Sequence, residues 1–411
     1  MKKYVLRLLG VLFVFALLVT AAYPAPAGST AGASLARVEA GKVYDFKAES
    51  PHPAVDGWTQ TYSFTGAEFV RLHFKAFHLA EGDKLVVSSP DGTQAWEYTG
   101  KGSNGDGDFW SFAINGADVT VTLSAPSGKS YGFQIVQVVY GSVPLEASKP
   151  LPGGIIGTIG AENVACHLDD PVIAATQKPV AIIYVLWGEH LEQATGFLVR
   201  GSEQNMLLTA SHVAYTQDVI NTMEARFNYQ YTDCEGTTLN MTTSYAGGEL
   251  LTTNFYVYIE PRAGETGLDY TLLTLRSKDQ GSPERLFGEL IPAANAYYQI
   301  GDPINIIQHP AGLPKMMGYW EDAEHTIRCK IDARDETYCW GYPNSNIGFS
   351  CDIAGGASGS PVMDPSNGYV LGVIHYDAED TGTFNAAVMM SMVCANAGDW
   401  LKCEEGPIPA P

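Results

Sequence analysis

Short runs of β-forming residues, separated by turn signals, follow one another along most of this chain. This pattern limits the fold more than any other feature. Val70, Leu72 and Phe74 alternate with polar neighbours, which is the period of a strand with one buried face. The same character returns at 84–88, 119–123 and 131–140, with turn signals that contain Gly or Pro between the runs. Strands this short and evenly spaced predict an all-β sandwich over residues 28–143.

The second half of the chain keeps the β character and predicts a second domain. Candidate strands lie at 180–187, 196–199, 206–209, 270–275, 304–308 and 370–375, and one short helix is expected within 389–403. A chain of 411 residues exceeds the size at which single cores divide. The Pro- and Gly-rich stretch at 144–155 indicates a linker. We therefore expect a domain over 156–404 and a disordered tail at 405–411.

The first 27 residues have the three parts of a secretory signal peptide. Lys2, Lys3 and Arg7 precede an apolar run at 8–19, and either Ala25-Pro26-Ala27 or Thr20-Ala21-Ala22 supplies small residues for cleavage. We expect a secreted protein, extracellular or periplasmic, with no membrane association after cleavage. An uncleaved N-terminal anchor is the alternative. The formal charge of −21, or −24 without those three basic residues, argues against nucleic acid as a partner.

Seven cysteines lie between Cys166 and Cys403, and in an exported chain they indicate disulfides with one thiol left over. We expect a bridge between Cys329 and Cys351, and a second from Cys166 to Cys394 or Cys403. The chain has no C-x-x-C or H-x-x-x-H spacing, so we expect neither a metal nor another cofactor.

Three residues have the chemistry of a nucleophile and its base. Ser358 stands in Gly356-Ala357-Ser358-Gly359, where glycine lets the backbone turn so that the Gly356 and Ser358 amides can point at one spot. A serine hydroxyl is a weak nucleophile unless a base takes its proton and donors stabilise the oxyanion. His212 ends one apolar segment and Asp269 begins another. Each residue alone fits a turn, a structural histidine or a strand cap, whereas together they indicate a Ser-His-Asp triad.

The order His212, Asp269, Ser358 resembles that of the trypsin-like, chymotrypsin-fold serine proteases. The resemblance covers roughly residues 156–404 and implies a double β-barrel. Gly356 to Pro361, with Gly196-Phe197-Leu198-Val199 and His309-Pro310-Ala311-Gly312, is most similar to the bacterial glutamyl and lysyl endopeptidases. Ala357 replaces the aspartate of the vertebrate enzymes, so activation by insertion of a new N-terminus is not expected.

The resemblance implies an endopeptidase that acts on proteins or peptides through an acyl-enzyme intermediate. Ser358 would attack, His212 would move the proton, and Asp269 would orient the histidine. Asp352, six residues before Ser358, occupies the place of a trypsin pocket carboxylate and predicts cleavage after Lys or Arg. His375 supports the alternative of cleavage after Glu, although Asp377, Glu379 and Asp380 would repel an acidic substrate.

Two further readings stay open for the whole chain. The run 69–92 is similar to CUB-type domains, so the first domain is expected to bind carbohydrate or protein. If the second domain were only structural, the chain would be a binding or adhesion protein. A serine esterase is also chemically allowed, because acyl transfer is the shared step.

Overall fold

The computed structural model describes residues 38–142, 161–255, 267–277, 281–322, 325–337, 342–376 and 384–407. The signal peptide expected at 1–27, the linker at 144–155 and the last four residues of the tail lie outside these ranges. All described residues belong to one compact unit, Ser34–Pro411. The domain boundaries inferred from composition stay predictions.

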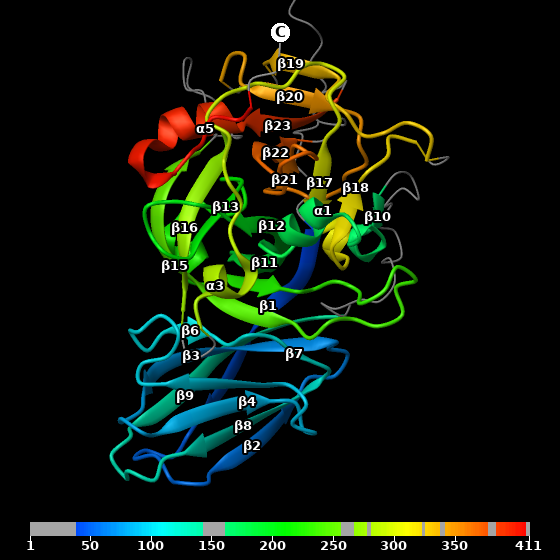
Figure 1. The fold of residues 1–411 in the computed structure, drawn as a ribbon. Coiled ribbons are helices and arrows are strands. Elements are labelled where there is room, and N and C mark those ends of the chain that lie inside the picture. Colours follow the sequence, from blue (N-terminus) through cyan, green and yellow to red (C-terminus); the bar gives the residue numbers. More distant parts are fainter. Residues whose placement is uncertain are drawn as a thin grey trace, which may run out of the picture. The chain divides into compact units, whose positions relative to one another are not determined.

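The N-terminal part is a β-sandwich, drawn in blue to green-cyan in Figure 1. One layer has the order β2-β8-β4-β5, and the facing strands are β1, β9, β3, β6 and β7. The bounds are β1 Val38–Glu49, β2 Thr59–Ser63, β3 Phe69–His78, β4 Lys84–Ser88, β5 Ala95–Thr99, β6 Phe109–Trp110, β7 Ile114–Asn115, β8 Asp118–Ser124 and β9 Gly132–Gly141. Alternate residues of facing strands, such as Leu72, Val87 and Val121, are buried in one core, as the sequence period predicts.

Six strands then close into a first barrel. They are β11 Val180–Trp187, β12 His190–Leu198, β13 Met206–Thr209, β14 Glu224–Phe227, β15 Thr243–Asn254 and β16 Tyr270–Arg276. The order β11-β14-β15-β16-β13-β12 is closed by pairing of β11 with β12. β11 is apolar along its whole length, and β13 and β14 are buried throughout, because both the interior of the barrel and its outer face are covered.

The last part is an eight-stranded sheet of order β10-β18-β17-β21-β22-β23-β20-β19, which forms a half-barrel. Its strands are β10 Ala161–Asn163, β17 Asn305–Gln308, β18 Met316–Gly318, β19 Ala333–Glu336, β20 Asn346–Phe349, β21 Pro361–Met363, β22 Val370–Tyr376 and β23 Asn385–Met389. The helices are short: η1 Val164–His167, α1 Pro171–Thr176, α2 Gln217–Ile220, α3 Pro283–Phe287, η2 Pro310–Gly312, α5 Met390–Ala397 and η3 Gly398–Trp400. The expected all-β class, a sandwich followed by a chymotrypsin-like double barrel, is confirmed.

The strand β1 belongs to both the sandwich and the first barrel. It pairs with β9 along residues 42–49, and its beginning pairs with β12, where Val38 is opposite Gln193 and Lys42 is opposite His190. Apolar side chains from both parts, among them Trp110 and Tyr184, pack in one cluster beside this junction. The sandwich is therefore joined to the barrel by a continuous sheet as well as by side chains.

A buried charge cluster crosses the same junction. Glu224 of β14 accepts hydrogen bonds from Arg226 at 2.8 Å and from the Ala113 amide at 3.0 Å. Its carboxylate lies 3.7 Å from the Arg71 guanidinium, and Arg71 donates to the carbonyls of Ser111 and Thr222. Arg71, Glu224 and Arg226 are all buried. A carboxylate on the barrel thus compensates an arginine from the sandwich.

The structure contains three disulfides, and one expectation about them was wrong. Cys329 pairs with Cys351 as predicted. Cys166 pairs with Cys234, and Cys394 pairs with Cys403. The chain turns back at Gly398, after α5, so Cys394 and Cys403 meet locally and neither is available to Cys166. Cys339, the cysteine that remains after these three pairs, lies outside the described residues.

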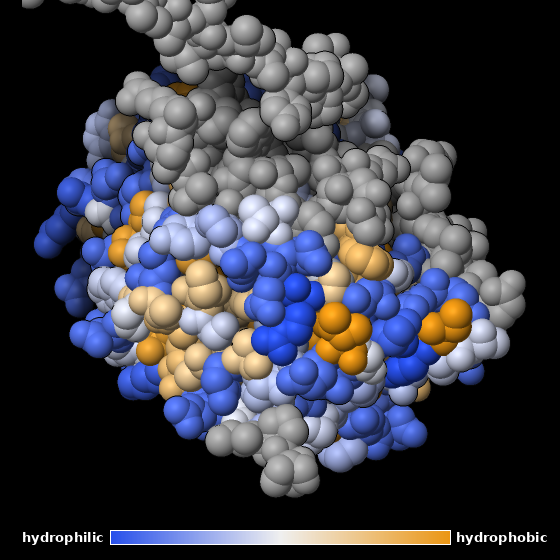
Figure 2. Space-filling view, turned by 90° about the horizontal axis from the view of Figure 1, so that it is seen from above, coloured by the Kyte–Doolittle hydropathy of each residue, from blue (hydrophilic) through white to orange (hydrophobic). Residues whose placement is uncertain are grey.

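The face drawn in Figure 2 is mainly hydrophilic, and its coloured hydrophobic residues form small separate groups. Within the described ranges, no helix has the length and apolar character needed to cross a membrane.

Candidate active site

The pairing of two barrel strands brings His212 and Asp269 together. β13 and β16 are antiparallel, with Thr209 opposite Thr271. His212 follows the end of β13 and Asp269 precedes the start of β16, so both residues lie at the same end of this strand pair. His212 Nδ1 is 2.8 Å from Asp269 Oδ2, and the His212 amide donates to Asp269 Oδ1 at 2.9 Å. Asp269 has a φ of 53°, a conformation that is uncommon outside glycine and often marks functional sites.

The Asp269 carboxylate is buried and held by several donors. Ser211 Oγ donates to Oδ1 at 2.6 Å, and His375 Nδ1 lies 3.5 Å from Oδ2. Burial alone would raise the pKa of Asp269, but the charge and the hydrogen bond of His212, together with the nearby His375, hold it well below its usual range. Asp269 is therefore a carboxylate at neutral pH, which suits a partner that orients a histidine and stabilises its charged form.

Ser358 lies in a tight loop between β20 and β21. The Ala357 amide donates to the Ala354 carbonyl and the Ser360 amide to the Ala357 carbonyl, both at 2.9 Å. Gly356 and Gly359 have φ values of 95° and 85°. A Cβ on Gly359 would lie 2.1 Å from the Thr195 carbonyl oxygen and 3.1 Å from the Ala210 amide nitrogen. The loop thus packs against the segment that leads from β13 to His212.

The backbone amides of Gly356 and Ser358 both lack a protein acceptor among the described residues. Their neighbours Ala357, Gly359 and Ser360 all donate to carbonyls. Two unused donors around a half-buried serine are what an oxyanion site requires.

Asp352 and His375, the two residues expected in a specificity pocket, have different surroundings. Asp352 is half-buried, its Oδ2 has no partner within the described part of the chain, and burial raises its pKa to about 7. His375 is buried beside Asp269, and its Nε2 lies 2.6 Å from Asn346 Oδ1. Burial lowers the pKa of His375. Asp377, Glu379 and Asp380 lie outside the described residues.

Sequence reasoning missed three residues at this site. Ser211 binds Asp269, Asn346 binds His375, and Thr195 binds the serine loop. Ser211 stands directly before His212, so its position was a usable signal. Thr195 and Asn346 carry no local signal, because their partners are more than 25 residues away in sequence.

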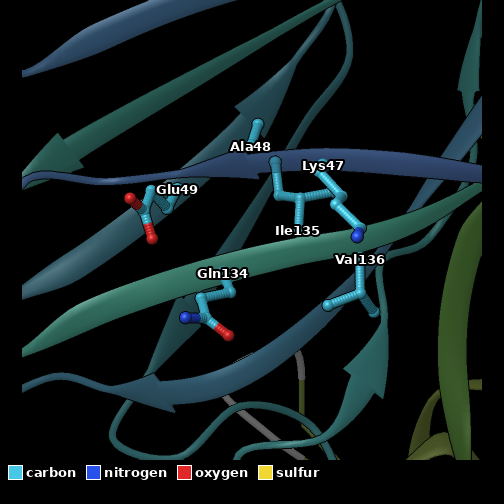
Figure 3. Close-up of a pocket in the computed structure, with 6 residues that line it drawn as sticks. All are labelled: Lys47, Ala48, Glu49, Gln134, Ile135 and Val136. Carbon is cyan, nitrogen blue, oxygen red and sulfur yellow. The ribbon is translucent and has the colours of Figure 1, made fainter.

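A separate pocket of about 410 Å³ lies on the sandwich, away from these residues. Figure 3 shows its lining, which comes entirely from β1 and β9: Lys47, Ala48, Glu49, Gln134, Ile135 and Val136. No group of three or more metal-ligating side chains occurs within the described ranges.

Residues 194–373 match the family model of the trypsin-like peptidase domain. This segment is similar to the trypsin-like peptidase domain. The matched segment covers His212, Asp269 and Ser358, and it ends within β22 of the half-barrel. The sandwich lies outside the match to this peptidase domain.

Individual relatives are distant. The chain is similar to "Secreted RxLR effector protein 73" of Plasmopara viticola, at 23% identity over 327 residues, which are 75% of each chain. Among solved structures it is similar to the active form of the Rv3671c protease from M. tuberculosis, at 18% identity and a TM-score of 0.37, covering 63% of this chain and 96% of that one. The serine endoprotease from Yersinia pestis has 14% identity and a TM-score of 0.37, with 55% and 63% covered.

Proposed function

We propose that this chain is a secreted serine endopeptidase in which Ser358, His212 and Asp269 form the catalytic triad. The observation that carries the proposal is the buried hydrogen bond between His212 Nδ1 and Asp269 Oδ2, beside the loop of Ser358. It orients the imidazole of His212 in the way that a catalytic triad requires. The match to the trypsin-like peptidase domain supports the same chemistry.

The reaction would run through an acyl-enzyme. Ser358 Oγ attacks the peptide carbonyl as His212 takes its proton, and His212 then passes that proton to the leaving amine. The Gly356 and Ser358 amides would receive the oxyanion, at roughly 2.7–4 kcal/mol per donor. Water, activated by the same histidine, then releases the acid.

Cleavage after Lys or Arg is the specificity that we propose, with Asp352 as the pocket carboxylate. Its unpartnered, buried Oδ2 supports this, because a buried carboxylate gains from a cationic partner. A glutamyl endopeptidase that uses His375 is the alternative, as expected for the glutamyl and lysyl branch. The contact of His375 with Asp269 favours Asp352 as the residue that faces substrate.

Secretion is proposed from the N-terminal signal pattern and supported by the three disulfides. The net charge of −21 supports protein or peptide partners over nucleic acid.

For the sandwich, which we compare with CUB-type domains, we propose carbohydrate binding at the pocket in Figure 3. Lys47, Glu49 and Gln134 supply donors and acceptors there that suit sugar hydroxyls. Binding to a glycan array that weakens in the Lys47→Ala and Gln134→Ala variants would support this proposal. Binding to immobilised proteins but to no glycan would favour a protein partner instead.

The catalytic proposal is tested by removing the nucleophile and the base one at a time. Ser358→Ala and His212→Ala should each lower kcat/KM for peptides by at least about 10⁴-fold while leaving the circular dichroism spectrum unchanged. Phenylmethylsulfonyl fluoride should add to Ser358, as read by peptide mass mapping. A folded native protein that cleaves esters but no peptide would indicate an esterase, and one that cleaves neither and takes no label would indicate a binding protein.

A further inference from the structure

The serine loop is attached to the first barrel through one buried side chain, that of Thr195 in β12. Thr195 has no exposed surface. Its amide donates to the Ser358 carbonyl at 2.9 Å, and its hydroxyl donates to the Gly356 carbonyl at 2.8 Å. The same hydroxyl accepts the His309 amide at 3.0 Å. Thr209 Oγ1, at the end of β13, donates to the Thr195 carbonyl at 2.8 Å and holds Thr195 in turn.

These bonds fix the peptide planes that surround the two free amides. Because a peptide unit is planar, fixing a carbonyl oxygen also fixes the amide on the opposite side. Thr195 holds the carbonyls of Gly356 and Ser358, which flank the unit that carries the Ser358 amide. That unit is itself held by the bond from the Ser360 amide to the Ala357 carbonyl.

The Gly356 amide depends on Thr195 through a second route. It belongs to the peptide unit whose carbonyl, on Gly355, accepts the Ala311 amide at 2.6 Å. Ala311 lies in the turn that begins at His309, and the His309 amide is bound to the Thr195 hydroxyl. One hydroxyl therefore bridges the serine loop and the turn that supports it.

Glycine makes this restraint necessary. Gly356 has a φ of 95°, and a Cβ there would lie 2.7 Å from the His309 carbonyl oxygen, so the site demands glycine. Glycine also has more backbone conformations than any other residue, and the peptide units on either side of it rotate easily. Hydrogen bonds from outside the loop restrict this rotation and so hold the directions of both amides.

We infer that Thr195 is a positioning residue for the oxyanion site: its hydroxyl selects the loop conformation in which the Gly356 and Ser358 amides face the reacting carbonyl. This inference rests on the proposed function. Thr195 touches neither substrate nor the reacting atoms, and it acts through the backbone alone. Removal of the Thr195 hydroxyl should weaken binding of the transition state more than binding of the substrate.

The test removes the hydroxyl while keeping the shape. Thr195→Val should lower kcat by about 10- to 100-fold and change KM by less than about threefold. Here kcat is normalised to the concentration of active sites, which is measured by titration with an active-site label. Affinity for a peptide aldehyde, which forms the tetrahedral adduct, should fall by a similar factor. Thr195→Ser keeps the hydroxyl and should recover most of both losses.

Controls separate this role from a general effect on folding. Thr176→Val removes a hydroxyl that bonds only the Val172 carbonyl in α1, so it should leave kcat unchanged. Thr195→Ala, which cannot clash, should reproduce the kinetic loss if the valine variant does not fold. Unchanged kcat per titrated site in a folded Thr195→Val or Thr195→Ala protein overturns the inference alone, whereas an inactive native protein overturns the proposed function and the inference with it.

Discussion

At the scale of single residues, Asp352 is a half-buried carboxylate that stands six residues before Ser358 in the sequence. Gln308 Nε2 fixes its backbone carbonyl at 2.7 Å, but nothing in the described part of the chain binds its Oδ2. Burial raises its pKa to about 7. A lysine or arginine side chain of a substrate would supply the missing partner, and it would favour the charged form of the carboxyl.

Asp352→Asn should therefore lower kcat/KM for peptides with Lys or Arg before the cleaved bond by roughly 100-fold, about 2.7 kcal/mol. In the native protein, the ratio of kcat/KM for such a peptide to that for a matched neutral one should rise with pH through about 7, because the carboxyl must lose its proton. The ratio cancels any pH dependence that the two peptides share. Peptide-library profiling at two pH values measures both effects, and cleavage after Glu that is lost in His375→Ala would assign specificity to the other residue.

The raised pKa also predicts a change in stability, with a definite sign. Between about 3.8 and 7 the native state keeps a proton that the unfolded state has lost, so this group's contribution to the free energy of unfolding falls as pH rises through that window. In the Asp352→Asn protein this group does not titrate, so the free energy of unfolding does not contain this decrease with pH. At pH 8 it should be more stable than the native protein, by at most about 2 kcal/mol once solvent screening is counted, as urea unfolding at pH 4 and pH 8 will show.

At the scale of elements, β3 and β14 meet through buried charged side chains. Glu224 is the carboxylate that compensates Arg71, and it also binds Arg226. Removing one partner of a buried ion pair leaves the other charge without compensation, at a typical cost of about 3–5 kcal/mol.

Glu224→Gln should accordingly lower the free energy of unfolding by about 3–5 kcal/mol. The matched control is Glu97→Gln, which breaks an exposed pair with Lys84 and should change stability by less than about 1 kcal/mol. Urea unfolding followed by tryptophan fluorescence compares the two variants. Equal effects would mean that the cluster contributes no more than a surface pair.

The elements with a strong sequence pattern were predicted well. The bounds of β4, β11 and β13 agree with the predicted runs. β1 was missed, because Val38–Glu49 mixes Gly41 and two lysines into a strand that is specified by its partners β9 and β12. The role of Thr195 was also missed, since an interior threonine looks the same whether or not a loop from 161 residues away binds it.

At the scale of the whole molecule, a break in the chain between sandwich and barrel would not separate two independent units. A fragment that begins at residue 156 would leave residues 190–193 of β12 paired with β11 but without β1 on their other edge, and it would leave Glu224 without Arg71. Exposed strand edges pair with other chains. We expect this fragment to aggregate or to form oligomers, whereas residues 34–411 stay monodisperse by size-exclusion chromatography with light scattering. A monodisperse, active fragment would show that the sandwich is dispensable.

The shared strand β1 also bears on how such a chain could be recombined. Domains joined by a linker alone can be exchanged between genes, because each brings its own complete set of hydrogen bonds. Here, an incoming first domain would have to bring a strand in register with His190–Gln193 and an arginine that reaches Glu224. The sandwich and the barrels are thus expected to be inherited as one piece, with substitutions on either side of the junction selected together.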